Sequence, residues 1–294
     1  MDIIHHALIG GAGFSVATAA DQPLIGAAFV IGSLFPDLDV IFMLLGKRFY
    51  LKNHQAITHS LLLAPLYATG LCFTLLSLLH LGWSWVVFLA CLFGLLLHIG
   101  LDWFNTFRIA LFSPFLKQRY SLDAVFFIDS ITLFLTAAFY LLYRYYEITI
   151  IAIIYPLLFS SYLIFKLILQ RRTVNTLDAS FAIPSSLNPF EFYILEEKAE
   201  LTGYLYNSIS IKKHNLEVFQ NIDAKYQQLA NKSSVYKDIK AITRCLQITS
   251  VTISGEKMTI LAEDLAVRNF GGKFARTTLK FDLKGNLLSE VANI

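Results

Sequence analysis

Histidine and aspartate recur beside apolar segments in the first half of this chain, and both residue types can ligate metals or exchange protons. Five of the seven histidines are interleaved there with five aspartates, and a sixth, His80, lies apart from them. These residues are His5, His6, His54, His59 and His98, and Asp37, Asp39, Asp102, Asp123 and Asp129. Ionisable side chains next to hydrophobic segments are costly unless they are paired or bound to a cation, so they mark a candidate functional site.

The motif HIGLD has the most specific spacing. His98 and Asp102 are spaced i,i+4, so a helix would place both side chains on one face, where they could share a metal ion. The same spacing also suits an ordinary interfacial His–Asp hydrogen bond. The motif by itself leaves both interpretations open.

The motif FPDLD carries a pair of carboxylates. Asp37 and Asp39 follow Pro36, which favours an extended or first-turn backbone. One carboxylate could bind a metal while the other orients a histidine or binds a second ion. Alternatively, the two aspartates simply close the end of a helix.

The motif HQAITHS carries two histidines just before an apolar run. His54 and His59 flank a short segment, and His6 precedes the first apolar stretch of the chain. We expect Thr58 and Ser60 to cap the helix that begins there, which would explain them without catalysis. Histidines at a membrane interface are often merely interfacial, but the convergence of several such motifs favours a metal site.

A mixed set of imidazoles and carboxylates suits Zn²⁺, with Mn²⁺ or Fe as alternatives, better than Mg²⁺. The number of ligands would allow one to three ions. Such a site activates water and stabilises charge that develops on a phosphoryl or acyl oxygen. Asp39 or Asp123 could then act as general base. Basic residues that could hold an anionic head group are Arg108, Lys117 and Arg119.

The elements that must position these residues belong to a membrane protein. Hydrophobic residues make up 56% of the chain and charged residues only 15%, whereas soluble domains carry about 25% charged residues. Charges are sparse in residues 1–169 and reach ordinary density in residues 170–294. We therefore predict an α-helical polytopic membrane domain, followed by a small soluble α+β domain with an antiparallel sheet.

Crossing the hydrocarbon core as a helix takes about 20 apolar residues. Four segments satisfy this condition, namely Leu61–Leu79, Trp83–Leu101, Phe126–Tyr143 and Ile148–Leu169. Ala7–Ala20 and Leu24–Leu34 are each shorter than a span, and we interpret them as a hairpin of short helices packed through small residues. Residues 40–45 could instead extend the second helix of that hairpin.

The chain accordingly divides into a membrane domain at residues 1–172, a linker at 173–190 and an α+β domain at 191–294. The loops that carry basic residues lie on one side of the four predicted spans, and the positive-inside tendency makes that side cytoplasmic. The C-terminal domain would then also be cytoplasmic. A net charge of +3 gives no reason to expect a nucleic-acid partner.

The ordered set HHALIG, FPDLD, HQAITHSL and HIGLDWFNTF resembles the bacterial inner-membrane, metal-dependent hydrolase family. Its YdjM-like members are described as LexA-binding, inner-membrane-associated hydrolases. The resemblance covers roughly the first 145 residues, and the SPF, RYSLD and FFID elements also fit it. It implies a bacterial inner (cytoplasmic) membrane location and metal ligands at His6, Asp37, Asp39, His54, His59, His98 and Asp102, with Asp123 and Asp129 as outer candidates.

The chain departs from the family pattern at one motif. The family usually has His-Arg-Gly before Thr-His-Ser, whereas Gln55 and Ala56 follow His54 here. A glycine is also common in the family at the position of Arg108, so this arginine could restore the missing positive charge. The order of motifs is similar to that of zinc-dependent phospholipase C enzymes, which is a more distant analogy.

The function expected from these observations is metal-dependent hydrolysis of a lipid or phosphoester at the cytoplasmic face, with phospholipase C-like chemistry as the best match. The alternative is a non-catalytic protein in which a structural metal or a His–Asp network fastens short helices, while the C-terminal domain binds a protein partner. Transporters also carry intramembrane acids and histidines. Against transport, the acids gather at one predicted face and not at mid-span.

Overall fold

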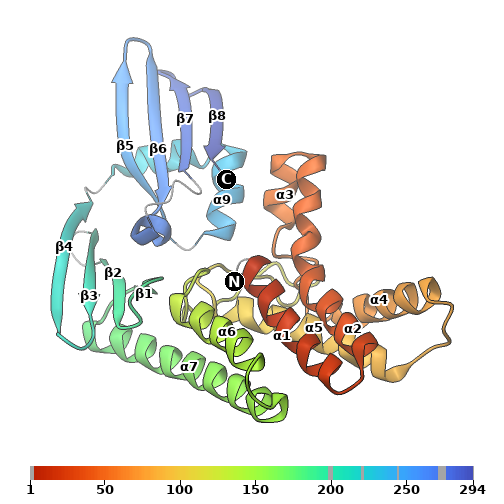
Figure 1. The fold of residues 1–294 in the computed structure, drawn as a ribbon. Helices are drawn as coiled ribbons and strands as arrows, with labels where there is room; N and C mark the ends of the chain where they lie inside the picture. The colour runs from red at the N-terminus through yellow and green to blue at the C-terminus, as the bar shows by residue number, and fades with distance from the viewer. Residues whose placement is uncertain (1–2, 198–200, 220–221, 244, 271–275, 294) are drawn as a thin grey trace. The chain divides into compact units, whose positions relative to one another are not determined.

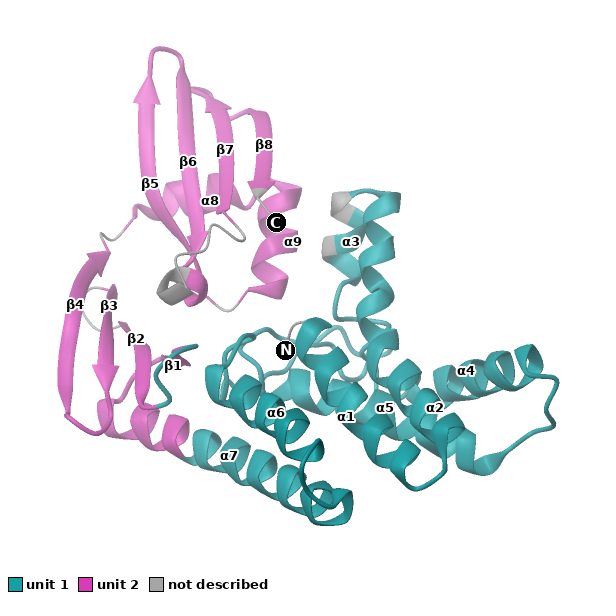
Figure 2. Cartoon of the chain, in the orientation of Figure 1, with its two compact units in different colours: residues 1–168, 186–189 teal, residues 169–185, 190–294 magenta. Residues whose placement is uncertain are grey.

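The computed structural model describes residues 3–197, 201–219, 222–243, 245–270 and 276–293. The chain forms two compact units (Figure 2), of which the first comprises residues 1–168 and 186–189 and the second residues 169–185 and 190–294. The first unit is helical and the second contains two antiparallel sheets (Figure 1). The predicted fold class, a helical membrane domain followed by an α+β domain, is confirmed.

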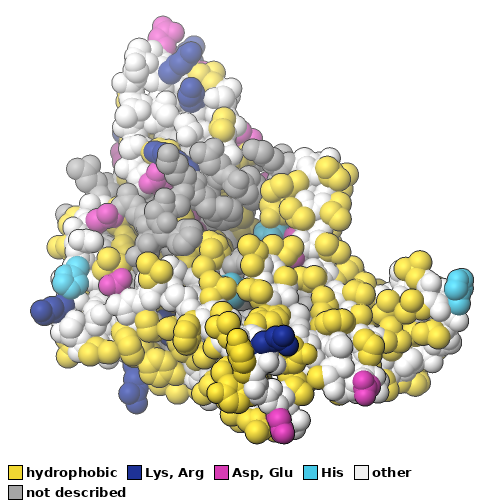
Figure 3. All heavy atoms as spheres, viewed as in Figure 1, with side chains coloured by type: hydrophobic (Ala, Val, Ile, Leu, Met, Phe, Trp, Pro, Cys, Tyr) yellow, Lys and Arg dark blue, Asp and Glu magenta, His cyan; other side chains and the backbone are white. Residues whose placement is uncertain are grey.

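The helical part of the chain consists of apolar helices, with a long irregular segment at residues 105–129 between α5 and α6. They are α1 (Ile3–Ala19), α2 (Pro23–Leu34), the 3-10 helix η1 (Phe35–Leu45), α3 (Lys47–Asn53), α4 (Ala64–Leu78), α5 (Trp85–Phe104), α6 (Ser130–Tyr143) and α7 (Ile148–Leu177). Large hydrophobic side chains on these helices are widely exposed, and they cover much of the visible surface of this unit (Figure 3). An apolar surface of this kind is suited to contact with lipid.

The lengths of the helices differ from the prediction at three places. Among the described residues, the helices long and apolar enough to cross a membrane are Pro23–Leu45, Trp85–Phe104 and Ile148–Leu177. The second helix of the N-terminal hairpin is thus extended by η1, as the alternative interpretation had it. Helices α4 and α6 contain only 15 and 14 residues, about 22 Å at 1.5 Å per residue, and fall short of the spans we predicted there.

Helices α4 and α6 both begin several residues after the start of the span predicted there. Residues 61–63 form turns before α4 begins at Ala64. Helix α6 begins at Ser130 because the carboxylate of Asp129 accepts hydrogen bonds from the backbone N–H groups of Ile131 and Thr132, which makes Asp129 its N-cap.

Close packing of α2 against α5 sets the frame of the first unit. A Cβ atom on Gly94 would overlap the backbone carbonyl of Phe29, and one on Gly32 would overlap that of Cys91. The two glycines therefore let the helix backbones touch, as small residues do in membrane helix pairs. The contact brings Ser33, near the end of α2, beside α5, and a buried core that includes Ala28, Cys91 and Leu95 lies along it.

The second unit begins at Leu169, near the end of the predicted membrane domain, and includes most of the segment expected to be a linker. Residues 173–190, where we expect a linker, contain the end of α7 and strand β1 (Phe181–Pro184). The first sheet has the order β1-β2-β3-β4, with β2 (Glu191–Glu197), β3 (Leu201–Asn207) and β4 (Lys212–Phe219). Strand β1 pairs with β2 from Phe181 opposite Leu195 to Pro184 opposite Phe192.

A second sheet follows two helices, α8 (Ala224–Ala230) and α9 (Ser234–Ile242). Its order is β5-β6-β7-β8, with β5 (Leu246–Ser254), β6 (Lys257–Asp264), β7 (Arg276–Asp282) and β8 (Leu287–Asn293), and the 3-10 helix η2 (Leu265–Phe270) lies between β6 and β7. The single antiparallel sheet of the prediction is thus replaced by two. Each can be built from sequential hairpins, which need only short connections.

Candidate metal centre

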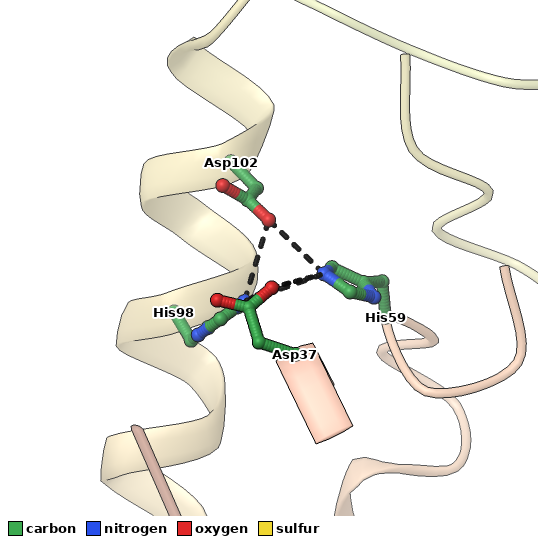
Figure 4. Close-up of side chains that lie close together, drawn as sticks. All are labelled: Asp37, His59, His98 and Asp102. Carbon is green, nitrogen blue, oxygen red and sulfur yellow. Dashed lines mark hydrogen bonds and ion pairs between the residues drawn. The ribbon is translucent and has the colours of Figure 1, made fainter. Parts of the chain in front are cut away.

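Four side chains from three segments of the first unit converge on one point (Figure 4). Asp37 comes from the first turn of η1, His59 from the loop before α4, and His98 and Asp102 from α5. One ligand atom from each lies within 4.8 Å of the others. His59, His98 and Asp102 are buried, whereas Asp37 keeps a side-chain exposure of 14%. We call this set the four-residue cluster.

The orientation of His98 follows from the packing of α2 on α5. Its Nδ1 lies 2.6 Å from the backbone carbonyl oxygen of Ser33. Because a carbonyl oxygen can only accept, Nδ1 carries a proton and donates it. The other ring nitrogen, Nε2, points into the cluster, where it lies 3.3 Å from an Asp102 oxygen and 3.5 Å from an Asp37 oxygen.

The orientation of His59 is set by its neighbour in sequence. The Thr58 hydroxyl donates to Asp39 Oδ2 at 3.2 Å and lies 3.1 Å from His59 Nδ1. Since its single proton goes to Asp39, the hydroxyl accepts from Nδ1–H, and His59 presents Nε2 to the cluster. Burial lowers the pKa of His59 below its usual value, which favours the neutral ring that a metal requires.

The two Nε2 atoms lie only 3.3 Å apart. Both rings are protonated on Nδ1, so two neutral imidazoles would point lone pairs at each other, and a proton or a cation must lie between them. Tetrahedral Zn²⁺ with bonds of about 2.0–2.1 Å separates two nitrogen ligands by about 3.3–3.4 Å. The observed separation has this value.

The carboxylates complete the cluster. Asp102 Oδ2 lies 3.0 Å from His59 Nε2, and Asp37 Oδ1 lies 4.0 Å from the same atom. The other oxygen of Asp37 is buried, and no described residue hydrogen-bonds it. An oxygen in this position is costly unless it has a partner. The donor set, the nitrogen separation and this oxygen together fit a divalent metal.

His6 borders the cluster without belonging to it. Its Nε2 lies 3.1 Å from Asp102 Oδ1, and its ring stacks on His98 at a centroid separation of 3.6 Å. His5 points elsewhere, with Nε2 3.1 Å from the Thr132 hydroxyl. The N-terminal histidine pair therefore supports two different parts of the unit.

Asp39 and His54, both predicted as metal ligands, form a supporting layer. The Asp39 carboxylate receives Gln55 N–H at 2.9 Å and lies 2.9 Å from His54 Nδ1, besides its bond to Thr58. It approaches His59 Nδ1 only to 3.8 Å. We had expected Thr58 to cap a helix, but α4 has no side-chain cap, and Thr58 instead orients His59.

Asp123 and Asp129 lie outside the four-residue cluster. Asp129 caps α6 and also accepts a hydrogen bond from the Tyr162 hydroxyl at 2.9 Å. Asp123 is buried and accepts a hydrogen bond from the Ser121 hydroxyl at 2.8 Å. Both acids thus have contacts that explain their burial, and Asp129 is used as a cap where we predicted a ligand.

The three predicted head-group residues occupy different environments. Arg119 donates to the backbone carbonyls of Arg108, Lys52 and His54 at 3.0 to 3.4 Å, and burial lowers its pKa to about 10, which still leaves it charged at neutral pH. It holds together the loops around the cluster. Lys117 is exposed and Arg108 is half-buried.

Two supporting groups were missed in the sequence. The Ser33 carbonyl carries no sequence signal, because any residue offers one. Lys166 did carry a signal, since a lysine inside an apolar helix needs a partner. It is fully buried and donates to the carbonyl of Pro189 at 2.8 Å, which fastens residues 186–189 to α7.

Apolar helices around a buried histidine–aspartate cluster define a membrane protein with a candidate metal centre. Residues 1–173 match the family described as YdjM inner membrane protein. This match covers more than half of the chain and all of the cluster, and the chain belongs to that family. The resemblance inferred from the motifs is thereby confirmed.

A relative of this chain is "Uncharacterized protein YfhP" of Bacillus subtilis (strain 168). It is 29% identical over 142 residues, which correspond to 42% of this chain and 41% of the relative. The chain thus spans less than half the length of that relative. No solved structure matches the chain significantly.

Proposed function

We propose that this protein is a membrane-embedded, metal-dependent hydrolase that acts at the cytoplasmic face on a lipid or other phosphoester. The observation that carries the proposal is the pair of Nε2 atoms held 3.3 Å apart between two carboxylates. A bound divalent metal, Zn²⁺ or alternatively Mn²⁺ or Fe, would activate water and stabilise charge on a phosphoryl oxygen. The cluster offers the ligands for one such ion.

The residues of the cluster and those next to it would have different roles. Asp37, His59, His98 and Asp102 would hold the metal, and Asp37 also offers the buried oxygen that no described residue hydrogen-bonds. That oxygen would take a proton from an attacking water. Asp39 has three donors on its carboxylate, so we assign it the positioning of His59, and Asp123 remains a second candidate for the base.

Substrate capture would rely on cations of the segment between α5 and α6. Lys117 is exposed, and together with Arg108 it would attract an anionic head group. Arg119 is committed to three carbonyls and would shape the loops. A cytoplasmic location of the C-terminal domain is part of the same proposal, and the distribution of basic residues between the two predicted faces supports it. The domain would there be available to a protein partner.

Metal analysis combined with a turnover assay tests the proposal. Protein purified in detergent without chelators is analysed by elemental mass spectrometry, then incubated with phospholipids while phosphate-containing products are measured. His98→Ala and Asp102→Asn should each lose bound metal and turnover. His214→Ala, an exposed histidine of β4, is the matched control and should keep both.

A structural His–Asp network is the second candidate function. Asp102 contacts His6, His59 and His98, so a proton in place of the metal would also join α1, α5 and the loop before α4. Metal-free protein that is fully stable would favour this network. Stoichiometric metal without turnover on any phospholipid class would indicate a structural metal.

A further inference from the structure

An apolar cavity of about 670 Å³ lies between α1, α2, α5 and α7 of the helical unit. Ligand pockets in proteins typically enclose about 300–1,000 Å³, so its size is that of a binding site. Its walls come from Ile9, Val16, Phe29, Phe93, Leu97 and Phe159, among others. The space is left open by small side chains in the lining, notably those of Ala17, Ala90 and Ala152.

Residues on neighbouring faces of α5 line the cavity and contribute to the four-residue cluster. Ala90, Phe93, Leu97 and Leu101 line the cavity, and their spacing places them along one face of the helix. His98 and Asp102 each follow a lining residue directly in sequence. One step along a helix turns the side chain by about 100°, so the two sites share an edge.

Helix α1 makes the same connection from the other side. His6, which contacts Asp102, is three residues before Ile9. Ile9 lines the cavity and packs with Leu101 and Phe159 in one buried apolar group. The near end of the cavity therefore lies beside the cluster. From Ile9 to Ala20, and from Leu101 back to Ala90, its walls extend along about 16 Å of helix.

The lining is suited to hydrocarbon and unsuited to water or a polar ligand. Its few polar side chains include Gln22 and Tyr155, and the Tyr155 hydroxyl already lies 2.9 Å from the Thr136 hydroxyl. Two of its walls belong to α5 and α7, which are long and apolar enough to cross a membrane. An apolar cavity bordered by such helices has lipid chains as its available occupant.

We propose that this cavity binds one acyl chain of a membrane phospholipid and thereby places the head-group phosphoester at the four-residue cluster. The head-group part of this assignment rests on the proposed hydrolase function, whereas the acyl-chain part stands on the cavity alone. Remote binding of a chain positions the reacting group of a substrate, which is a general way to use binding energy for catalysis. The substrate class that follows is a phospholipid with at least one long acyl chain.

Photocrosslinking tests the acyl-chain site without any need for turnover. The full-length protein is reconstituted in nanodiscs that contain a phospholipid with a diazirine in one acyl chain, and the labelled peptides are mapped by mass spectrometry. Label should concentrate on the lining parts of α1, α5 and α7. Ala152→Phe should lower that label about tenfold or more, because a phenyl ring displaces several methylene groups of the bound chain.

Matched variants separate the possible outcomes. Ala137→Phe places the same ring on an exposed position of α6 outside the cavity and should leave the labelling unchanged. Ala90→Phe fills the end of the cavity that is far from the cluster and should lower the label as Ala152→Phe does. Agreement between the two variants shows that the loss does not come from misfolding of one of them. His98→Ala should keep the label while it loses turnover. Wild-type protein that takes up label in the cavity but turns over no phospholipid would refute the hydrolase and leave the chain site standing. Label spread evenly over the exposed helices, or insensitive to both cavity-filling variants, would overturn the proposal.

Discussion

Replacing Asp39 by asparagine should weaken metal binding although Asp39 is not one of the four ligands. The carboxylate accepts from Gln55 N–H, Thr58 Oγ1 and the His54 side chain. An asparagine keeps one acceptor oxygen and adds an NH₂ group, so one of these donors must lose its acceptor. If the amide donates to the Thr58 hydroxyl, that hydroxyl no longer accepts reliably from His59 Nδ1–H.

The substitution would weaken metal binding because it changes the preferred tautomer of His59. Once Nδ1 loses its acceptor, the proton can move to Nε2, the atom that faces the cluster, and a protonated nitrogen cannot ligate. Removing a partner that orients a ligand typically costs 10–100-fold in metal affinity, or about 1.4–2.8 kcal/mol at tenfold per 1.4 kcal/mol. Asp39→Asn should fall in this range, and Thr58→Val should change the affinity in the same direction.

The assay is competition for Zn²⁺ against a chromogenic chelator with the purified protein in detergent. Asp21→Asn, an exposed acid in the turn before α2, is the matched control and should bind as the wild type does. His98→Ala sets the level for a lost ligand. An Asp39→Asn affinity equal to that of the wild type, alongside a loss in His98→Ala, would refute the tautomer argument.

Three further predictions concern the frame that holds the cluster, and thermal unfolding in detergent measures each of them. Gly94→Ala should destabilise the protein by about 1–3 kcal/mol because its methyl group would overlap the α2 backbone, whereas Gly100→Ala on the same helix meets nothing within 4 Å and should not destabilise. Asp129→Ala should cost about 0.5–2 kcal/mol through loss of the α6 N-cap, and unchanged stability would contradict that role. Arg119→Met should cost about 1.5–3 kcal/mol and expose residues 52–54 to proteolysis, because three carbonyls lose a charged donor, while the exposed Arg144→Met should show neither effect.

Much of the architecture was visible in the sequence, because it depends on local composition and periodicity. The low charge of residues 1–169 predicted a helical membrane part, and the i,i+4 spacing of His98 and Asp102 predicted a shared helix face. Both features are present in the structure. The positions at which helices start were less visible, since the Asp129 cap of α6 depends on backbone donors two and three residues ahead.

The composition of the candidate site was decided by tertiary contacts. Ten histidines and aspartates were singled out in the sequence, yet four of them meet at one point. Asp37 reaches it because glycines allow α2 to touch α5, and that same contact supplies the carbonyl that orients His98. The motifs therefore determined which side chains were available to bind a metal. Contacts between residues distant in sequence determined which nitrogen or oxygen of each side chain faces the cluster, and a single sequence does not encode such contacts in any local pattern.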